Sequence, residues 1–165
     1  MKRILLALSL AFVFTATPAQ NVITMNELLY GLTQFRNGNQ NTLQNTFNKY
    51  GYKTYQMGYN NFAFYKNMYM DNYRNIRPLP EGVSSLITID FNFLEATLRV
   101  YNQKAANKIE NELSNTFIVH PSNREADFAN SKYPGFIVTT TIYDKIFNIR
   151  YDMEEYNGII YNQYY

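Results

Sequence analysis

The sequence predicts an α+β protein in which two tandem helix-plus-antiparallel-meander units form one sheet with helices on one face. Three observations predict this class. Apolar residues recur at helical intervals in three segments, and they alternate with polar residues in the segments that follow. The order of helix, strand, irregular stretch and β-hairpin also occurs twice, which is typical of a duplication of about 50 to 60 residues. Because one short meander with one helix is marginal alone, we expect the two units to join edge to edge.

The chain opens with the pattern of a secretory signal peptide. Lys2 and Arg3 form a basic start, residues 4–14 are apolar apart from one serine, and residues 17–19 offer small side chains at a cleavage site. The apolar stretch is about half of the ~20 residues that a bilayer-spanning helix needs. Cleavage and export to the periplasm or out of the cell are therefore predicted rather than membrane anchoring.

The predicted domain organisation follows from this start. A signal peptide, residues 1–19, precedes a single domain, residues 20–165. We expect the domain to consist of unit one at about 24–103, unit two at about 104–156 and a C-terminal tail at 157–165.

Two helices are predicted at the start of the domain. Thr24 and Glu27 have the Thr-x-x-Glu spacing of a capping box, and apolar residues at helical intervals follow, which predicts a helix over 25–36. A second amphipathic pattern predicts a helix over 41–50, with Gly51 well placed to end it.

After Gly51 the pattern changes to that of strands. Short segments rich in aromatic residues predict strands at 52–56 and 62–65, with a turn at 60–61. Residues 66–83 contain prolines, a glycine and polar residues without a clear period, so a long loop is predicted there.

The next elements are a hairpin and a helix. Apolar and polar residues alternate on both sides of a turn near residues 93–95, which predicts a β-hairpin over 86–101 with one buried face. Ala105, Ile109 and Leu113 lie at helical spacing and predict a third helix over 104–116, with Glu110 and Glu112 facing solvent.

A second meander is predicted after this helix. A short strand at 117–119 leads into a polar loop over 121–134. Residues 136–143 and 146–153 are expected to form a hairpin that turns at Asp144-Lys145.

Charge and cysteine content exclude several classes of protein. Without Lys2 and Arg3, the 15 basic residues become 13, which balance 13 acidic residues, so a nucleic-acid partner is disfavoured. The chain has no cysteine, which excludes a disulfide framework and a lipid anchor on cysteine. We expect no transmembrane span in the mature chain.

The order of elements resembles known architectures. The resemblance rests on Leu43, Phe47, Tyr50-Gly51-Tyr52 and the hairpins at 86–101 and 136–151. The order of a helix, a glycine at the helix end and meandering strands occurs twice in this chain. This order resembles the architecture of β-lactamase inhibitor protein and of the small outer-membrane assembly lipoproteins. Unlike them, this chain lacks the lipoprotein cysteine and the disulfides of the inhibitor. The resemblance implies the tandem fold and a binding role, of which inhibition is one form.

A closer similarity is to secreted Bacteroidota proteins that share the helix, turn and strand order. The turn here is Lys49-Tyr50-Gly51-Tyr52. Those proteins are uncharacterised, so the similarity implies an exported α+β protein and no activity.

Few residues offer catalytic chemistry. His120 is the only histidine, so no histidine-based metal cluster can form, and a solvated histidine is expected at that position. Common hydrolase and nucleotide-binding motifs do not occur, and no cofactor or metal is expected. A pair of carboxylates could still hydrolyse a glycan, which makes a glycan hydrolase the alternative function. The candidate carboxylates are Asp90, Glu95, Glu110, Glu112, Asp144, Asp152, Glu154 and Glu155.

The long loop holds the candidate binding residues. Tyr69, Tyr73, Arg74 and Arg77 lie within nine residues, and Tyr and Arg are the residues enriched at binding hot spots. The sequence therefore predicts an exported, non-catalytic binding or interaction protein for a protein or glycan partner in the envelope or outside the cell.

A second alternative is a small outer-membrane β-barrel, because residues 157–165 end on an aromatic residue as a last barrel strand does.

Overall fold

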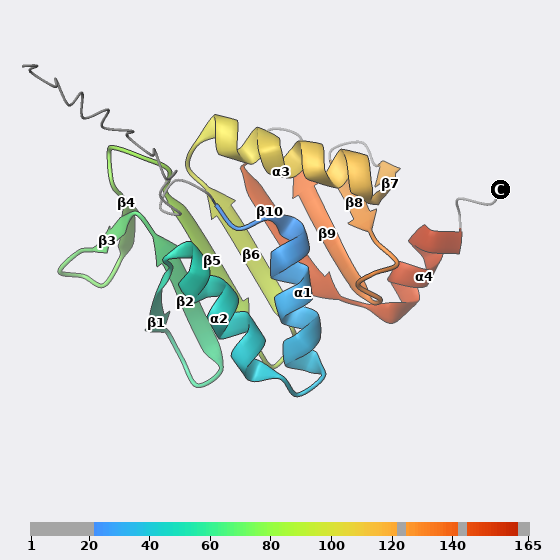
Figure 1. Ribbon diagram of the computed structural model, residues 1–165, viewed down its shortest axis with the longest axis horizontal. Coiled ribbons are helices and arrows are strands. Elements are labelled where there is room, and N and C mark those ends of the chain that lie inside the picture. The colour runs from blue at the N-terminus through green and yellow to red at the C-terminus, as the bar shows by residue number, and fades with distance from the viewer. Residues whose placement is uncertain (1–21, 122–124, 142–144, 162–165) are drawn as a thin grey trace, which may run out of the picture.

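The structure is a computed structural model that describes residues 22–121, 125–141 and 145–161 (Figure 1). The predicted signal peptide and Asp144 of the predicted turn lie outside the described residues.

The predicted α+β class is confirmed. An eight-stranded antiparallel sheet has the strand order β1-β2-β5-β6-β10-β9-β8-β7, and β3 and β4 form a separate two-stranded sheet. Figure 1 shows α1, α2 and α3 against one face of the large sheet. The strands are β1 (Lys53–Gln56), β2 (Asn61–Lys66), β3 (Met68–Met70), β4 (Ile76–Pro78), β5 (Ser85–Asp90), β6 (Glu95–Val100), β7 (Ile118–Pro121), β8 (Glu125–Ala129), β9 (Phe136–Thr141) and β10 (Ile146–Tyr151). The helices are α1 (Met25–Arg36), α2 (Gln40–Tyr50), α3 (Gln103–Thr116) and α4 (Met153–Tyr161).

The predicted helices at the start of the domain are confirmed. Thr24 caps α1, because its Oγ1 accepts a hydrogen bond of 3.2 Å from the backbone N–H of Glu27. Helix α2 ends at Gly51, whose φ of 75° lies in the left-handed region that glycine adopts without strain. Gly31 allows α1 to approach α2 closely, since a Cβ there would lie 2.6 Å from Cδ1 of Leu43.

The first strands and hairpin also follow the prediction, but residues 66–83 do not form one long loop. They contain β3 and β4, which pair with each other in a three-residue register from Met68↔Pro78 to Met70↔Ile76. These strands are too short, and the turn between them is too polar, for the sequence to show an alternating pattern of apolar and polar residues.

The prediction of a polar loop over 121–134 is wrong in its first part, because β8 lies there. Strand β8 pairs with both β7 and β9, so its backbone hydrogen bonds come from the sheet. Phe128 faces the main core, whereas its neighbour Asp127 faces the other side. The polar residues that suggested a loop therefore belong to the face of the strand that points away from the main core.

The predicted C-terminal tail, residues 157–165, is helical in its described part, which belongs to α4. Asp152 caps this helix, and its Oδ1 accepts hydrogen bonds from the backbone N–H groups of Glu154 and Glu155 at 2.9 and 3.0 Å. Tyr156 and Ile159 of α4 pack with Ile137 in a second, smaller core. Because residues on either side of Ile137 face the main core, α4 lies against the opposite face of the sheet.

The two meanders share one main core. Strand β6 pairs with β10, and this pair joins β1-β2-β5-β6 to β10-β9-β8-β7. Phe47, Ile87 and Leu98 from the first part and Phe136 and Phe147 from the second are fully buried in that core. The origin of the two parts by duplication stays a prediction.

Candidate functional site

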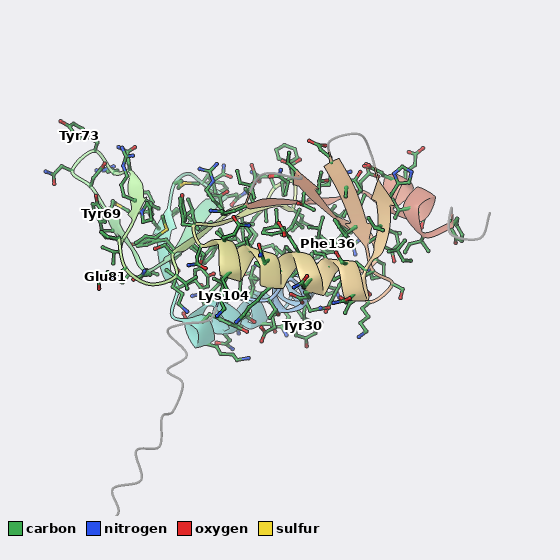
Figure 2. All side chains as sticks on the ribbon, turned by 90° about the horizontal axis from the view of Figure 1, so that it is seen from above. Tyr30, Tyr69, Tyr73, Glu81, Lys104 and Phe136 are labelled. Carbon is green, nitrogen blue, oxygen red and sulfur yellow. The ribbon has the colours of Figure 1, made fainter. Side chains whose placement is uncertain are left out.

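The four candidate binding residues lie on one projecting hairpin. We call residues 68–78, which contain β3, β4 and their turn, the tyrosine hairpin. Tyr69 of β3 is directly opposite Arg77 of β4, and Tyr73 lies in the turn between the strands. Figure 2 shows Tyr69 and Tyr73 at one end of the molecule, on the side of the sheet away from Tyr30 and Lys104. The side chains of Tyr73 and Tyr69 are 87% and 48% exposed.

Asp71 fixes the turn of the tyrosine hairpin. Its Oδ1 accepts hydrogen bonds from the backbone N–H groups of Tyr73 at 2.9 Å and Asn75 at 2.8 Å. Its Oδ2 accepts from Nδ2 of Asn75 at 3.1 Å and from Nε of Arg77 at 3.5 Å. Desolvation acts to raise the pKa of Asp71, but these hydrogen bonds together lower it from its ordinary value. The sequence pattern did not single out Asp71 as a site residue, although aspartate at the first position of a turn is the signal that could have identified it.

The base of the hairpin is attached to the rest of the protein. Asn67, with φ of 52°, redirects the chain after β2. Its side-chain Nδ2 donates to the carbonyl oxygen of Glu81 at 2.5 Å and to Oγ of Ser84 at 3.1 Å, while Ser84 Oγ donates to the Asn67 carbonyl oxygen at 2.6 Å. Met68 is buried just beyond this point. The hairpin is therefore held at both its base and its turn.

The two arginines of the tyrosine hairpin have different surroundings. Arg74 adopts a left-handed backbone conformation, with φ of 64°, and its side chain is exposed at the turn. Arg77 forms an ion pair of 3.5 Å with Asp71. The structure thus brings Tyr69 and Arg77 together and places Tyr73 and Arg74 side by side in the turn.

The candidate carboxylates are distributed over several elements. Asp90 and Glu95 are opposite each other at the end of the β5–β6 hairpin, where Asp90 Oδ1 accepts from the backbone N–H of Asn92 at 2.8 Å. Asp152 caps α4, and Glu155 binds Arg150 with an Oε1 to Nη2 distance of 2.5 Å. Asp144 lies outside the described residues, as noted above. These contacts give Asp90, Asp152 and Glu155 structural roles at a turn and at the start of a helix.

The expectation that Glu112 faces solvent is wrong. Its carboxylate accepts hydrogen bonds from the backbone N–H groups of Met25 and Asn26, both at 2.9 Å, and from Nδ2 of Asn26 at 2.6 Å. Glu112 of α3 therefore caps the N-terminus of α1, where a negative charge also interacts favourably with the helix dipole. These partners are 86 and 87 residues away in the sequence, so helical spacing alone could not reveal them.

His120 lies on the edge strand β7 with an exposed side chain, opposite Asp127 of β8. The side chain of His120 is therefore exposed to solvent, as predicted, and the residue belongs to a strand. Within the described part of the chain, no group of three His, Cys, Asp or Glu side chains could hold a metal ion.

A polar cluster lies on the face of the sheet opposite α1 to α3. Arg150 donates to Glu155 and to Oγ1 of Thr139, and it lies 3.5 Å from Asp127. Thr139 Oγ1 in turn lies 2.5 Å from Asp127 Oδ1. Because the cluster connects β8, β9 and β10 with the start of α4, its evident role is to attach that helix to the sheet.

Two grooves occur on the described surface. One, of about 740 Å³, lies between α3 and the segment before α1, and Lys104, Lys108 and Glu112 line it. The other, of about 410 Å³, lies between the α1–α2 corner and the β1–β2 turn, and most of its lining is aromatic or amide-bearing. We call the second one the aromatic groove. Neither groove is lined by the tyrosine hairpin.

Comparison of the chain with protein-family models, curated proteins and solved structures found no match. Among the described residues, no helix is both long and apolar enough to cross a membrane.

Proposed function

We propose that this protein is an exported, non-catalytic binding protein that captures a partner through the tyrosine hairpin. The single observation that carries the proposal is the exposed position of Tyr73, 87% accessible, on a turn that Asp71 holds in place. An aromatic ring on an ordered turn can bury a large area on binding while losing little conformational freedom.

The charge and composition of the hairpin support a protein or glycan partner. Tyr69 and Tyr73 provide aromatic surface, and the residue after Tyr73, Arg74, adds a guanidinium group with five donors. The signal-peptide pattern of residues 1–19 supports a location in the envelope or outside the cell. Inhibition of the partner is one consequence that such binding would have.

The test is capture of a partner from envelope and culture-supernatant fractions of the source organism by tagged mature protein that begins at Gln20. We expect one stoichiometric partner, identified by mass spectrometry. The double substitution Tyr73→Ala with Arg74→Ala should abolish capture, because it removes both the ring and the adjacent charge.

The matched control is Tyr30→Ala with Lys104→Ala, which removes an exposed tyrosine and a positive charge from the helix side of the sheet. This variant should capture the partner as the wild type does. Equal capture by the hairpin variant, with its circular dichroism unchanged, would contradict the proposed role of the hairpin.

A further inference from the structure

A second binding site is suggested by the aromatic groove. It lies at the opposite end of β2 from the tyrosine hairpin, because β2 begins beside the groove at residue 61 and ends just before Asn67. Its volume of about 410 Å³ falls within the range of small-ligand pockets. The two sites are therefore separate, and the inference about the groove does not rest on the function proposed for the hairpin.

Aromatic rings form one wall of the groove. The ring centroids of Phe35 and Phe91 are 4.3 Å apart, and those of Phe62 and Phe91 are 5.6 Å apart. All three phenylalanines pack on the main core but are only partly buried, so part of each ring borders the groove. Tyr59, which also lines the groove, is 91% exposed in the β1–β2 turn.

Amide groups provide the polar part of the lining. Gln40, Asn41 and Gln44 come from the first turns of α2, and Asn60 lies across from them in the β1–β2 turn. The Nδ2 of Asn60 donates to Asn92 at 2.6 Å, and this bond fixes the orientation of the Asn60 side chain. Each amide offers a carbonyl acceptor and an NH₂ donor, so the groove can both donate and accept hydrogen bonds.

The charges of the residues that line the aromatic groove limit the class of ligand that it can bind. None of the described residues that line the aromatic groove is charged, whereas Lys104, Lys108 and Glu112 line the other groove. An ionic ligand would find no opposite charge in the aromatic groove. A purely aliphatic ligand would cover the amides without forming hydrogen bonds to them, which costs free energy.

We infer that the aromatic groove binds a neutral saccharide. A sugar ring has an apolar face of C–H groups that can lie on Phe and Tyr rings, and hydroxyl groups at its edge that can pair with Gln and Asn amides. This combination matches a lining of rings and amides without charges. The Tyr59 ring closes over one side of the sugar, and Gln44 of α2 contacts its hydroxyl groups.

The inference is tested by nuclear magnetic resonance titration of the mature protein with neutral trisaccharides. The probes are maltotriose, cellotriose and tri-N-acetylchitotriose, each followed by saturation transfer and by shifts of the protein amide signals. At least one should bind, with shifts at residues 40–44 and 59–62. Tyr59→Ala and Gln44→Ala, both at exposed positions, should each weaken binding, the first by about tenfold.

Two control variants separate this site from the hairpin. Tyr30→Ala and the double substitution Tyr73→Ala with Arg74→Ala should leave saccharide affinity unchanged. Likewise, Tyr59→Ala should leave capture of a partner by the hairpin unchanged. The saccharide inference and the proposed function can therefore fail independently.

Three results would overturn the inference. The first is that none of the three trisaccharides binds at millimolar concentration. The second is that binding occurs but is unaffected by Tyr59→Ala and Gln44→Ala in variants whose circular dichroism matches the wild type. The third is that anionic 3′-sialyllactose or apolar 1-octanol occupies the groove in preference to the neutral sugars.

Discussion

Glycine positions show how a single residue decides local geometry. Gly135 has φ of 86°, and a Cβ there would lie 2.7 Å from both Cζ of Tyr151 and Sδ of Met153. Gly38 has a similar φ of 88° but open space around it, and Gly58 has neither feature. Substitutions at these three glycines therefore distinguish the energetic cost of backbone strain from the cost of a steric contact.

We expect Gly135→Ala to destabilise the protein most. Gly38→Ala should cost about 1 kcal/mol through left-handed backbone strain alone. Gly135→Ala should cost at least about 1 kcal/mol more, because Tyr151 must also move. Gly58→Ala, the control, should change the free energy of unfolding by less than about 0.5 kcal/mol. Urea denaturation measures all three, and equal effects of Gly135→Ala and Gly38→Ala would contradict the predicted contact.

Glu27 connects the start of α1 to the end of α2. Its carboxylate accepts a hydrogen bond from Nζ of Lys49 at 2.7 Å, another from Oγ1 of Thr24 at 3.0 Å, and a third from the hydroxyl group of Tyr50. Burial alone would raise the pKa of Glu27, but these hydrogen bonds lower it below its ordinary value of 4.5.

The lowered pKa predicts a dependence of stability on pH. Because the unfolded chain binds a proton at this carboxylate more readily than the folded protein, Glu27 stabilises the fold above pH 4.5. That contribution is lost as the pH falls from 4.5 through the lowered pKa. Glu27→Gln should therefore lower the melting temperature at pH 7, and the difference from the wild type should shrink in acid.

Thermal melts from pH 7 to acid check this prediction. Glu95→Gln, an exposed carboxyl at the start of β6, is the matched control. If the difference between the wild type and Glu27→Gln stayed constant across the pH range, the carboxylate would not be the titrating group.

At the scale of elements, α3 fixes where α1 begins. Glu112 accepts three hydrogen bonds from Met25 and Asn26, and the hydroxyl group of Tyr133 donates to Oδ1 of Asn26 at 3.0 Å. Helix α1 is thus capped by Thr24 from its own sequence and by Glu112 from α3.

Glu112→Ala is expected to destabilise the protein by about 1 to 3 kcal/mol, because it leaves partly buried N–H groups of α1 without an acceptor. Glu110→Ala on the same helix is the control and should cost less than about 0.5 kcal/mol. Hydrogen exchange at the amides of Met25 and Asn26 should speed up only in Glu112→Ala. Unchanged exchange there would contradict the capping role.

The tyrosine hairpin shows how far the sequence could predict the candidate site. Tyr69, Tyr73, Arg74 and Arg77 were identified by residue type and proximity, and the structure places them on one hairpin. The pairing of Arg77 with Asp71 was not predicted, because it depends on the turn that brings β4 back beside β3. The residues of the aromatic groove come from α1, α2, β1, β2 and two turns, so no local pattern in the sequence marks them.

At the scale of the whole molecule, the pairing of β6 with β10 makes the two meanders depend on each other. Leu98 of β6 and Phe147 of β10 are register partners, and both are fully buried in the main core. Separation of the meanders would expose these side chains and leave both strands without one neighbour.

We therefore expect the mature chain to unfold in a single cooperative transition, and the fragments 20–103 and 104–165 not to fold alone. Circular dichroism and tyrosine fluorescence should give coincident melting curves for the mature chain. Each fragment should show no cooperative melt. A cooperative melt of either fragment by itself would instead establish two independent domains.

The sequence by itself determined the elements whose signals are local. The capping pattern of Thr24, the left-handed stop at Gly51 and the alternation in residues 86–101 depend on neighbours a few positions away, and the structure confirms the helices and strands predicted from them. The α+β class followed from the same local periods.

Only the tertiary structure decided the features that depend on distant partners. Strand β8 is a strand because β7 and β9 satisfy its backbone, although Glu125 and Asp127, on its side away from the main core, are polar. Helix α4 is positioned by Ile137 and Ala129 on the far face of the sheet, and α1 by Glu112 of α3. Such contacts form only once the chain has folded, because hydrogen bonding and burial act between residues close in space, whatever their separation in the sequence.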